Sequence, residues 1–325
     1  DNTKVSKYMP IGVSNAAWND PFTGYAESED KEYMTIMNDN NLTWEPRLVN
    51  RDHGLMLYSS LQLRSGRMNV QGIETRQLPS GKITDATAQG YLASQYNDPF
   101  FYRSMGLLFR THYAYKSKYI FDFTFRRDGS TKFAESQKFG NFPGISAKYI
   151  ISDETWMQPL KPWLSTLAIR PSWGITGNEP PYEGLQYSRY AAYGEYLGEE
   201  AMRPSTPQIG IRWEKSTSSN LGFDIGFFED KFVFDINLYH KRTEDLLMKD
   251  IALPSSSGVA KYPWYNVGIM DNDGWELNFQ TFDAIKINKF KMDFNFNLSN
   301  FVNTIVDFDD NVLESYQGEF GYNNG

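Results

Sequence analysis

The chain has 325 residues, a formal net charge of −8 and no cysteine, so it has neither a disulfide framework nor a thiolate metal site. No cluster of Lys and Arg stands out, and we therefore expect no nucleic-acid partner. Aromatic residues make up 16% of the chain although its mean hydropathy is −0.55, and no apolar run reaches the roughly 18 residues of a membrane-spanning helix.

The first segment, residues 1–53, is rich in Pro, Asn and Asp and shows no regular alternation. We expect it to be an irregular extracellular loop region, with a short helix near residues 33–37. The chain opens at Asp1 without a signal peptide. We therefore expect either a mature protein or a piece of a longer one, and the loop-like end GEFGYNNG favours the second.

Beyond residue 53, apolar and polar residues alternate with period two, which predicts strands. A tight turn at Ser65-Gly66 is expected to separate the first two strands. The expected strands lie at residues 55–63, 68–78, 105–116, 119–126, 142–151, 164–174, 221–227, 232–239, 274–282 and 290–299.

The expected hairpin at residues 213–247 shows most clearly what kind of strands the chain contains. Its arms are about ten residues long, one face is bulky and aromatic, and a short turn at Glu229-Asp230 joins them. A strand of that length and pattern spans a bilayer when it is tilted. Short connections also alternate with long ones at residues 79–103, 129–141, 175–213 and 244–270. This layout is typical of an outer-membrane barrel, so we predict that residues 54–325 are barrel wall.

Several motifs in a fixed order resemble the SusC/RagA family of TonB-dependent outer-membrane transporters. They lie at residues 113–119 (YAYKSKY), 126–133 (RRDGSTKF), 142–147 (FPGISA), 170–178 (RPSWGITGN), 213–224, 239–247 (YHKRTEDLL), 266–276 and 300–306. Gly144 departs from the FPS pattern of the family. Each motif alone is weak, but their order over about 200 residues is specific.

This resemblance implies an all-β fold: about ten antiparallel strands of a 22-stranded barrel whose plug, TonB box and final strands lie outside this chain. It implies import of oligosaccharides or oligopeptides through the outer membrane of a Gram-negative, Bacteroidetes-type bacterium. The implied partners are a SusD-like surface lipoprotein, the TonB-ExbB-ExbD complex acting on the plug, outer-membrane lipid, and a second SusCD unit. One alternative is a soluble or surface-exposed, aromatic-rich β-sandwich that binds glycans, and a weaker one is a passive porin or adhesin.

Two groups of side chains are candidates for solute contact. Aromatic residues expected outside strands could stack on sugars or apolar peptide groups, or could simply pack the loops together. They are Trp18, Trp44, Tyr182, Tyr187, Tyr190, Tyr193, Trp264 and Tyr265. Polar residues expected to face the lumen could contact a solute, or could bond to the plug and to water. They are Asp122, Arg126, Asp224, Asp235, Asn237, Asp293 and Asn295.

Nothing in the sequence favours catalysis or a cofactor. The three histidines, His53, His112 and His240, are far apart and have no metal-ligand spacing. The acidic stretch at residues 307–311 could hold Ca²⁺, although a plain acidic loop explains it better. We therefore expect no catalytic residue, no resident metal and no enzymatic activity.

Overall fold

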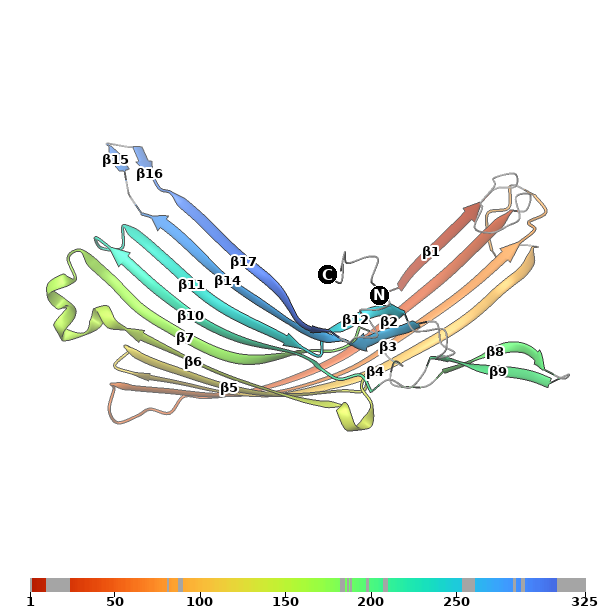
Figure 1. The fold of residues 1–325 in the computed structure, drawn as a ribbon, viewed down its shortest axis with the longest axis horizontal. Coiled ribbons are helices and arrows are strands. Elements are labelled where there is room, and N and C mark those ends of the chain that lie inside the picture. Colours follow the sequence, from red (N-terminus) through yellow and green to blue (C-terminus); the bar gives the residue numbers. More distant parts are fainter. Residues whose placement is uncertain are drawn as a thin grey trace, which may run out of the picture. The chain divides into compact units, whose positions relative to one another are not determined.

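The computed structural model describes residues 2–9, 24–80, 82–86, 90–181, 185, 187, 189–196, 199–206, 210–252, 261–282, 285–287 and 290–308. Eleven strands form one sheet in the order β1-β2-β3-β4-β5-β6-β7-β10-β11-β14-β17 (Figure 1). They are β1 (Asn2–Met9), β2 (Tyr25–Trp44), β3 (His53–Arg76), β4 (Tyr91–Tyr115), β5 (Tyr119–Ser130), β6 (Phe139–Ile150), β7 (Leu164–Asn178), β10 (Glu214–Phe227), β11 (Phe232–Glu244), β14 (Gly268–Thr281) and β17 (Asn295–Phe308).

Three two-stranded ribbons form separate small sheets, and each lies in the connection between two strands that are neighbours in the large sheet. They are β8 (Arg189–Tyr196) with β9 (Glu199–Thr206), β12 (Leu247–Ala252) with β13 (Lys261–Asn266), and β15 (Ile285–Ile287) with β16 (Phe290–Met292). Short 3-10 helices are η1 (Glu135–Gln137), η2 (Ile151–Asp153) and η3 (Thr155–Leu160). Among the described helices, none is long and apolar enough to cross a membrane.

The fold class predicted from the sequence is confirmed, with eleven strands in the large sheet against about ten expected. The strands join one sheet instead of two packed sheets, which argues against the β-sandwich alternative. The chain divides into two compact units: unit 1 contains Asp1–Asn38 and Leu63–Ser104, and unit 2 contains Asp39–Gln62 and Met105–Gly325. Strands β2, β3 and β4 contribute residues to both units.

Unit 2 contains the hairpin on which the sequence prediction was based. Leu221 of β10 lies opposite Leu238 of β11, and the ladder continues in this register to Phe227 opposite Phe232. The turn between the strands holds Glu229 and Asp230 at positive φ, which costs energy for residues other than glycine. Ser165 at the start of β7 stabilises that turn, because its hydroxyl accepts a bond from the Asp230 amide at 2.9 Å.

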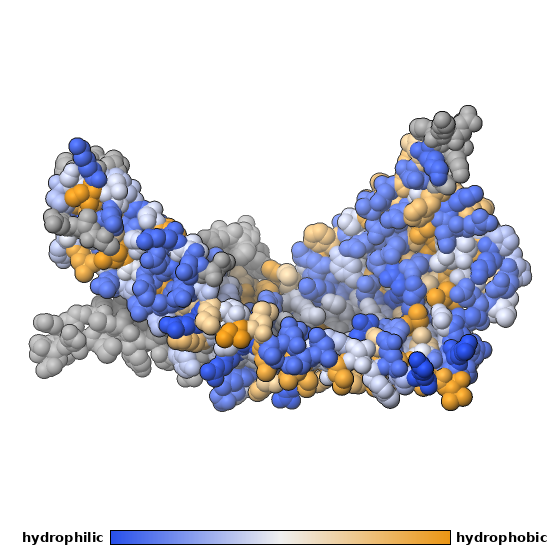
Figure 2. Space-filling model, turned by 180° about the vertical axis from the view of Figure 1, so that it is seen from behind, coloured by the Kyte–Doolittle hydropathy of each residue, from blue (hydrophilic) through white to orange (hydrophobic). Residues whose placement is uncertain are grey.

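One face of the unit 2 sheet carries rows of large apolar side chains. Phe123 of β5 lies opposite Ile145 of β6, which lies opposite Trp173 of β7, and the three are 38%, 42% and 41% exposed. Farther along the sheet, Leu238 lies opposite Trp275 in the same way. Hydrophobic side chains therefore lie in patches at the surface, between hydrophilic ones (Figure 2). A face of this kind requires an apolar solvent.

Unit 2 also has an aromatic core built from its long connections. Trp213 packs on Phe133 and Phe142, with ring centroids 4.5 and 5.4 Å apart, and Leu185 and Ile211 complete the buried cluster. The indole N–H of Trp213 also donates to the carbonyl of Lys138 at 3.3 Å. This core joins the loops around residues 131–138, 179–185 and 210–213 to the rim of the sheet.

Unit 1 is built differently, because the paired parts of β1 and β2 carry mostly polar side chains on both faces. β1 pairs with β2 from Asn2 opposite Glu32 to Met9 opposite Tyr25. The buried core of this unit is small: Ala26, Leu78 and Ala86, which bring the connection at residues 78–86 against β2.

Three predictions about the first hundred residues are wrong. Residues 1–53 are not an irregular loop region, because they contain β1 and β2, and residues 33–37 belong to β2 instead of a helix. No turn occurs at Ser65-Gly66, where β3 continues. Residues 91–103, expected to be a loop, belong to β4. The boundary at residue 53 therefore does not separate a loop region from a sheet.

Candidate functional site

The polar face of the unit 2 sheet carries an ion-pair network that crosses four strands. Arg170 of β7 donates through Nε to Asp224 of β10 at 2.8 Å and through Nη2 to Asp235 of β11 at 2.9 Å. Lys148 of β6 donates to the other carboxylate oxygen of Asp224 at 2.9 Å. Asn237 donates to Asp235. Two cations thus neutralise two carboxylates on this face.

Arg170 reaches Asp235 by passing over β10, and Gly222 makes this passage sterically possible. Arg170 lies opposite Gly222, which lies opposite Asn237. A Cβ at Gly222 would lie 3.0 Å from Arg170 Cζ and 2.9 Å from Asn237 Oδ1, which is closer than most real contacts. A larger residue at 222 would therefore force the side chain of Arg170 or Asn237 to shift from the position it has here.

Two smaller clusters lie on the polar residues of β4 and β5. Asp122 accepts a bond from Arg110 Nη2 at 2.8 Å and lies 3.0 Å from His112 Nδ1. Arg126 Nε contacts both carboxylate oxygens of Asp128, at 2.8 and 2.7 Å, and its Nη2 donates to Gln62 at 3.1 Å. Strong pairing of this kind makes these side chains a pre-organised charged surface instead of isolated charges.

The structure brings together three of the seven polar residues expected to face the lumen. Asp224, Asp235 and Asn237 share one network, while Asp122 and Arg126 belong to the two clusters on β5. Asn295 of β17 lies opposite Gln280 of β14. Asp293 lies between β16 and β17, outside the sheet. Their contact with a solute stays a prediction.

The expectation that the eight aromatic candidates lie outside strands is mostly wrong. Trp44 is the last residue of β2, Tyr190 and Tyr193 belong to β8, and Trp264 and Tyr265 belong to β13. Trp264 and Tyr265 pack against the aromatic core of unit 2, so part of each ring is used for packing.

The three remaining aromatic candidates lie elsewhere. Tyr187 lies outside the strands, and its side chain is 63% exposed. Trp18 and Tyr182 lie outside the described residues. Ligand contact stays a prediction for all eight.

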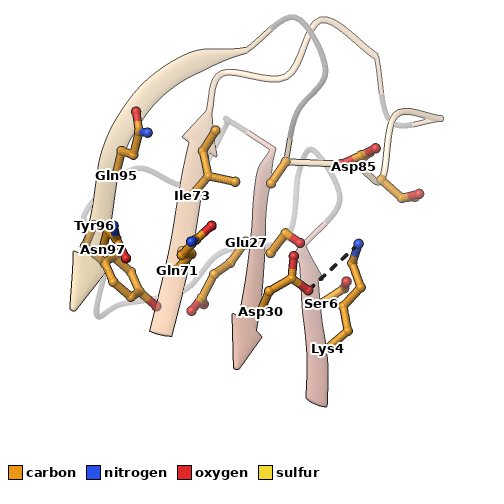
Figure 3. Close-up of a pocket in the computed structure, with 14 residues that line it drawn as sticks. Lys4, Ser6, Glu27, Asp30, Gln71, Ile73, Asp85, Gln95, Tyr96 and Asn97 are labelled. Atoms are coloured by element: carbon orange, nitrogen blue, oxygen red, sulfur yellow. Dashed lines mark ion pairs between the residues drawn. The ribbon is translucent and has the colours of Figure 1, made fainter. Parts of the chain in front are cut away.

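Unit 1 carries a polar groove that sequence reasoning missed (Figure 3). The groove has a volume of about 790 Å³ and lies over β1 to β4, with the connection at residues 84–86 as one wall. Amide side chains of Gln71, Gln95 and Asn97 line it together with carboxylates and hydroxyl groups. Its volume is within the range of small-ligand sites.

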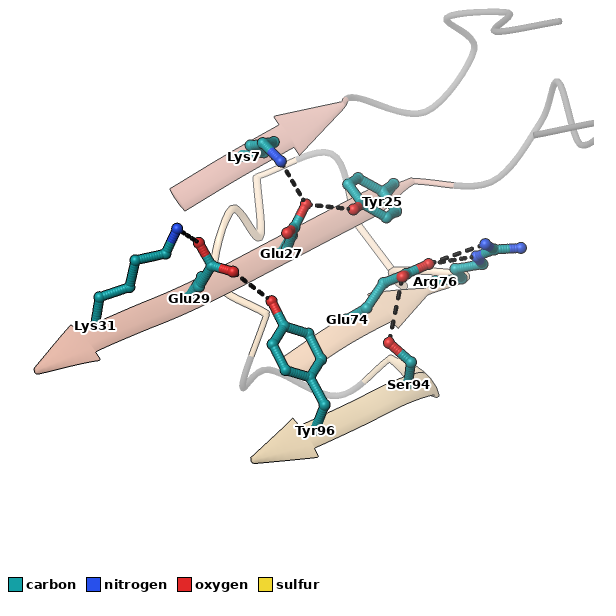
Figure 4. Close-up of polar contacts among 9 residues, drawn as sticks. All are labelled: Lys7, Tyr25, Glu27, Glu29, Lys31, Glu74, Arg76, Ser94 and Tyr96. Atoms are coloured by element: carbon teal, nitrogen blue, oxygen red, sulfur yellow. Dashed lines mark hydrogen bonds and ion pairs between the residues drawn. The ribbon is translucent and has the colours of Figure 1, made fainter. Parts of the chain in front are cut away.

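A second set of polar contacts in unit 1 orders the carboxylates of β2 (Figure 4). Tyr25 donates to Glu27 at 2.7 Å, and Lys7 Nζ lies 3.1 Å from the same carboxylate oxygen. Tyr96 of β4 donates to Glu29 at 2.6 Å, and Lys31 lies 2.9 Å from its other oxygen.

These bonds shift the pKa values of the groups that make them. β3 and β4 have 24 and 25 residues, roughly twice the length that crosses a bilayer, so a spanning segment needs only part of each strand. The hydrogen bonds from Tyr25 and Tyr96 lower the pKa of Glu27 and Glu29, respectively, below the ordinary 4.5. The bond to Glu29 raises the pKa of Tyr96 to about 12, so this phenol stays protonated at neutral pH.

Known proteins show the same organisation. Residues 7–323 match the family described as TonB dependent receptor-like, beta-barrel. The chain belongs to this family. It is 27% identical over 330 residues to TonB-dependent receptor P3 of Formosa agariphila, a match that covers 98% of this chain and 32% of that protein. It is 29% identical to TonB-dependent receptor SusC of Bacteroides thetaiotaomicron over 58% of this chain and 19% of that protein.

Solved structures agree on the fold. The RagAB peptide transporter matches 95% of this chain and 34% of its own with a TM-score of 0.79, at 20% sequence identity. These likenesses confirm the SusC/RagA resemblance inferred from the motifs. The chain spans about a third of the length of the P3 receptor, so what the whole protein does is a matter for proposal.

Within the part of the chain that the structure describes, no three His, Asp or Glu side chains come together as ligands for a metal. Asp307 lies at the end of β17, and the rest of the predicted acidic stretch lies outside the described residues. The described polar side chains offer recognition through hydrogen bonds and charge.

Proposed function

We propose that this chain is part of the wall of an outer-membrane transporter that imports oligosaccharides or oligopeptides in a TonB-dependent manner. The observation that carries the proposal is the two-faced sheet of unit 2 in a chain of this receptor family. Apolar rows suit lipid on one face, and paired charges suit a water-filled or plugged lumen on the other. Binding and gating, not bond making, are the work that such a wall performs.

The connections support an orientation. The turns at residues 116–118 and 228–231 are short, while the connections that carry β8-β9 and β12-β13 are long. In outer-membrane barrels the short turns face the periplasm and the long loops face outward. We place unit 1 and the aromatic core of unit 2 on the outer side, where a SusD-like lipoprotein would meet them.

The partners follow from the same proposal. The relatives include a receptor named SusC and the RagA-containing RagAB transporter. We propose a SusD-like lipoprotein over the outer loops, with TonB, ExbB and ExbD acting through a plug. A second copy of the SusCD pair would complete the assembly. The polar residues of β5, β10 and β11 would then face a plug or a passing solute.

Uptake by cells tests this function. The full-length receptor would be expressed in a Bacteroidetes-type host with and without a functional TonB complex, and uptake of labelled oligosaccharides and oligopeptides would be compared. Import that requires both the receptor and TonB supports the proposal. Equal uptake without TonB would show a passive porin instead. Affinity purification of the tagged receptor tests the partner, which should copurify as a lipoprotein.

A further inference from the structure

One wall of the unit 1 groove is made by residues 84–86 of the connection between β3 and β4, beside a small buried core. Leu78 and Ala86 are 4% and 1% exposed and pack with Ala26 of β2. The amide of Ile83 donates to the carbonyl of Ser80 at 3.1 Å, which closes a turn within the connection. Thr84 and Asp85 line the groove from this wall, so their positions are set before any ligand arrives.

The floor of the groove offers side chains rather than main-chain groups. Ser28 lies opposite Ser6 in the β1-β2 ladder, and Gln71 and Gln95 enter from β3 and β4 (Figure 3). A peptide captured by a sheet gains its affinity chiefly from main-chain bonds at an unpaired edge. The β1 and β2 main chains at this floor are paired with each other, so a peptide backbone would find few partners here.

Side-chain amides, hydroxyls and carboxylates suit a ligand with many hydroxyl groups. Each amide both donates and accepts, and each carboxylate accepts two bonds, as adjacent hydroxyls require. The partly buried Ile73 adds apolar surface against which the C–H groups of a ring can pack.

The described lining carries more carboxylates than cations, which disfavours polyanionic ligands. Glu27, Asp30 and Asp85 are among the described lining residues, and Lys4 is the cation among them. Lys4 Nζ lies 4.0 Å from Asp30 and Lys7 Nζ lies 3.1 Å from Glu27, so lysines balance two of these three charges. A polyanionic chain would meet net negative charge in this groove.

We propose that the unit 1 groove binds a neutral, hydroxyl-rich oligosaccharide chain. The proposal rests on the import function proposed above and assigns part of its specificity to strands outside the membrane-spanning wall. The groove selects by hydroxyl pattern and against negative charge.

Calorimetry on the purified full-length receptor in detergent tests the groove. The probes are glucose hexamers with α-1,4, β-1,3 or β-1,4 linkages, a hexagalacturonate, and a hexapeptide of Ser and Asn. The double variant Gln71→Leu/Gln95→Leu removes two amides, and we expect Kd for the neutral hexamer that binds best to rise about tenfold. The matched control Asn38→Leu/Asn40→Leu changes two exposed amides of β2 outside the groove and should leave Kd unchanged.

A second variant tests the charge. Asp30→Asn/Asp85→Asn removes two negative charges from the lining, so the affinity for hexagalacturonate should rise several-fold relative to the affinity for the neutral hexamer. Unchanged Kd in the double Leu variant, or a wild type that prefers the peptide or the acidic hexamer or binds no neutral hexamer, overturns the proposal. Neither result affects TonB-dependent uptake, whereas TonB-independent uptake would refute the import function itself.

Discussion

Strand β5 in unit 2 and strand β2 in unit 1 belong to the same sheet but meet different surroundings. In β5, Phe121 and Phe123 form an apolar row on one face, and Asp122 lies between them on the other. In β2, Glu27 and Glu29 occupy one face and Ser28 and Asp30 the other. The first pattern separates lipid from a polar interior, and the second is compatible with water on both sides.

The two units also differ in what stabilises them. Unit 2 has a buried cluster of large rings around Trp213, and unit 1 has a small cluster of Leu78 with two alanines. Unit 1 compensates with polar bonds such as those of Tyr25 and Tyr96 to the glutamates of β2. Apolar burial should therefore contribute more to the stability of unit 2 than to that of unit 1.

The largest effect on stability is expected from removing the Trp213 ring at the centre of the unit 2 core. Trp213→Ala should lower the free energy of local opening around residues 131–138 and 210–213 by about 3–5 kcal/mol, because it leaves a cavity between Phe133 and Phe142. Leu78→Ala in unit 1 should cost less, about 2 kcal/mol, because its buried neighbours are small. Hydrogen exchange of the full-length receptor measures both. Trp44→Ala, at a ring that is 56% exposed, is the control. A larger loss for Leu78 would reverse the comparison.

A second test places a charge on each kind of surface. Phe123→Arg should destabilise the folded receptor by about 2–4 kcal/mol if its row faces lipid near the bilayer centre. Leu92→Arg, at a residue of β4 in unit 1 that is 49% exposed, should change stability by less than about 0.5 kcal/mol. Urea unfolding in lipid vesicles gives both values. Equal costs would mean that the two surfaces share one environment.

The third test compares ion pairs. Arg170→Met leaves Asp224 and Asp235 facing each other without their shared cation, and should cost about 1 kcal/mol because all three groups are partly exposed. Lys7→Met in unit 1 removes a pair whose lysine side chain is 64% exposed, and its effect should be close to zero. The same vesicle assay applies. Full recovery of Arg170→Met by the second change Asp235→Asn would confirm that repulsion between the carboxylates is the cause.

The smallest effect concerns pH and belongs to unit 1. The pKa of Glu29 is lowered by the Tyr96 hydrogen bond, so its stabilisation is present above pH 4.5 and is lost as pH falls through the lowered pKa. Tyr96→Phe should therefore weaken unit 1 at pH 7 and match the wild type once Glu29 is protonated in both. Protease sensitivity of the β3-β4 connection, followed from pH 7 to pH 3, reports this. A difference that persists at pH 3 would assign the effect to packing.

The contrast between the units also explains how much the sequence could predict. Alternation of apolar and polar residues predicted the β10-β11 hairpin with its turn at Glu229-Asp230, and it placed Asp224 and Asp235 among the polar residues of one face. β1 and the part of β2 that pairs with it carry mostly polar residues at successive positions, which produces no clear signal of period two. Ser65-Gly66 reads as a turn, yet the ring of Tyr102 covers Gly66, where a Cβ would lie 2.1 Å from Tyr102 Cε1. Cross-strand cover of this kind depends on a partner that local sequence does not identify.

The groove of unit 1 could not be predicted for the same reason. Its lining comes from four strands and one connection, and its wall depends on packing among Ala26, Leu78 and Ala86. Small apolar residues scattered over 60 positions carry no motif. The loop aromatics had a clear chemical rationale, but Trp264 and Tyr265 were already engaged in packing.

The passage of Arg170 over Gly222 has a consequence for how this family can vary. We expect substitutions at positions 170, 222 and 235 to be correlated among relatives, because a side chain at 222 and a long cation at 170 compete for the same space. Descendants that acquire a residue larger than glycine at 222 should also lose the arginine at 170 or the carboxylate at 235. Selection would then record, in correlated substitutions, a contact between strands that are not neighbours.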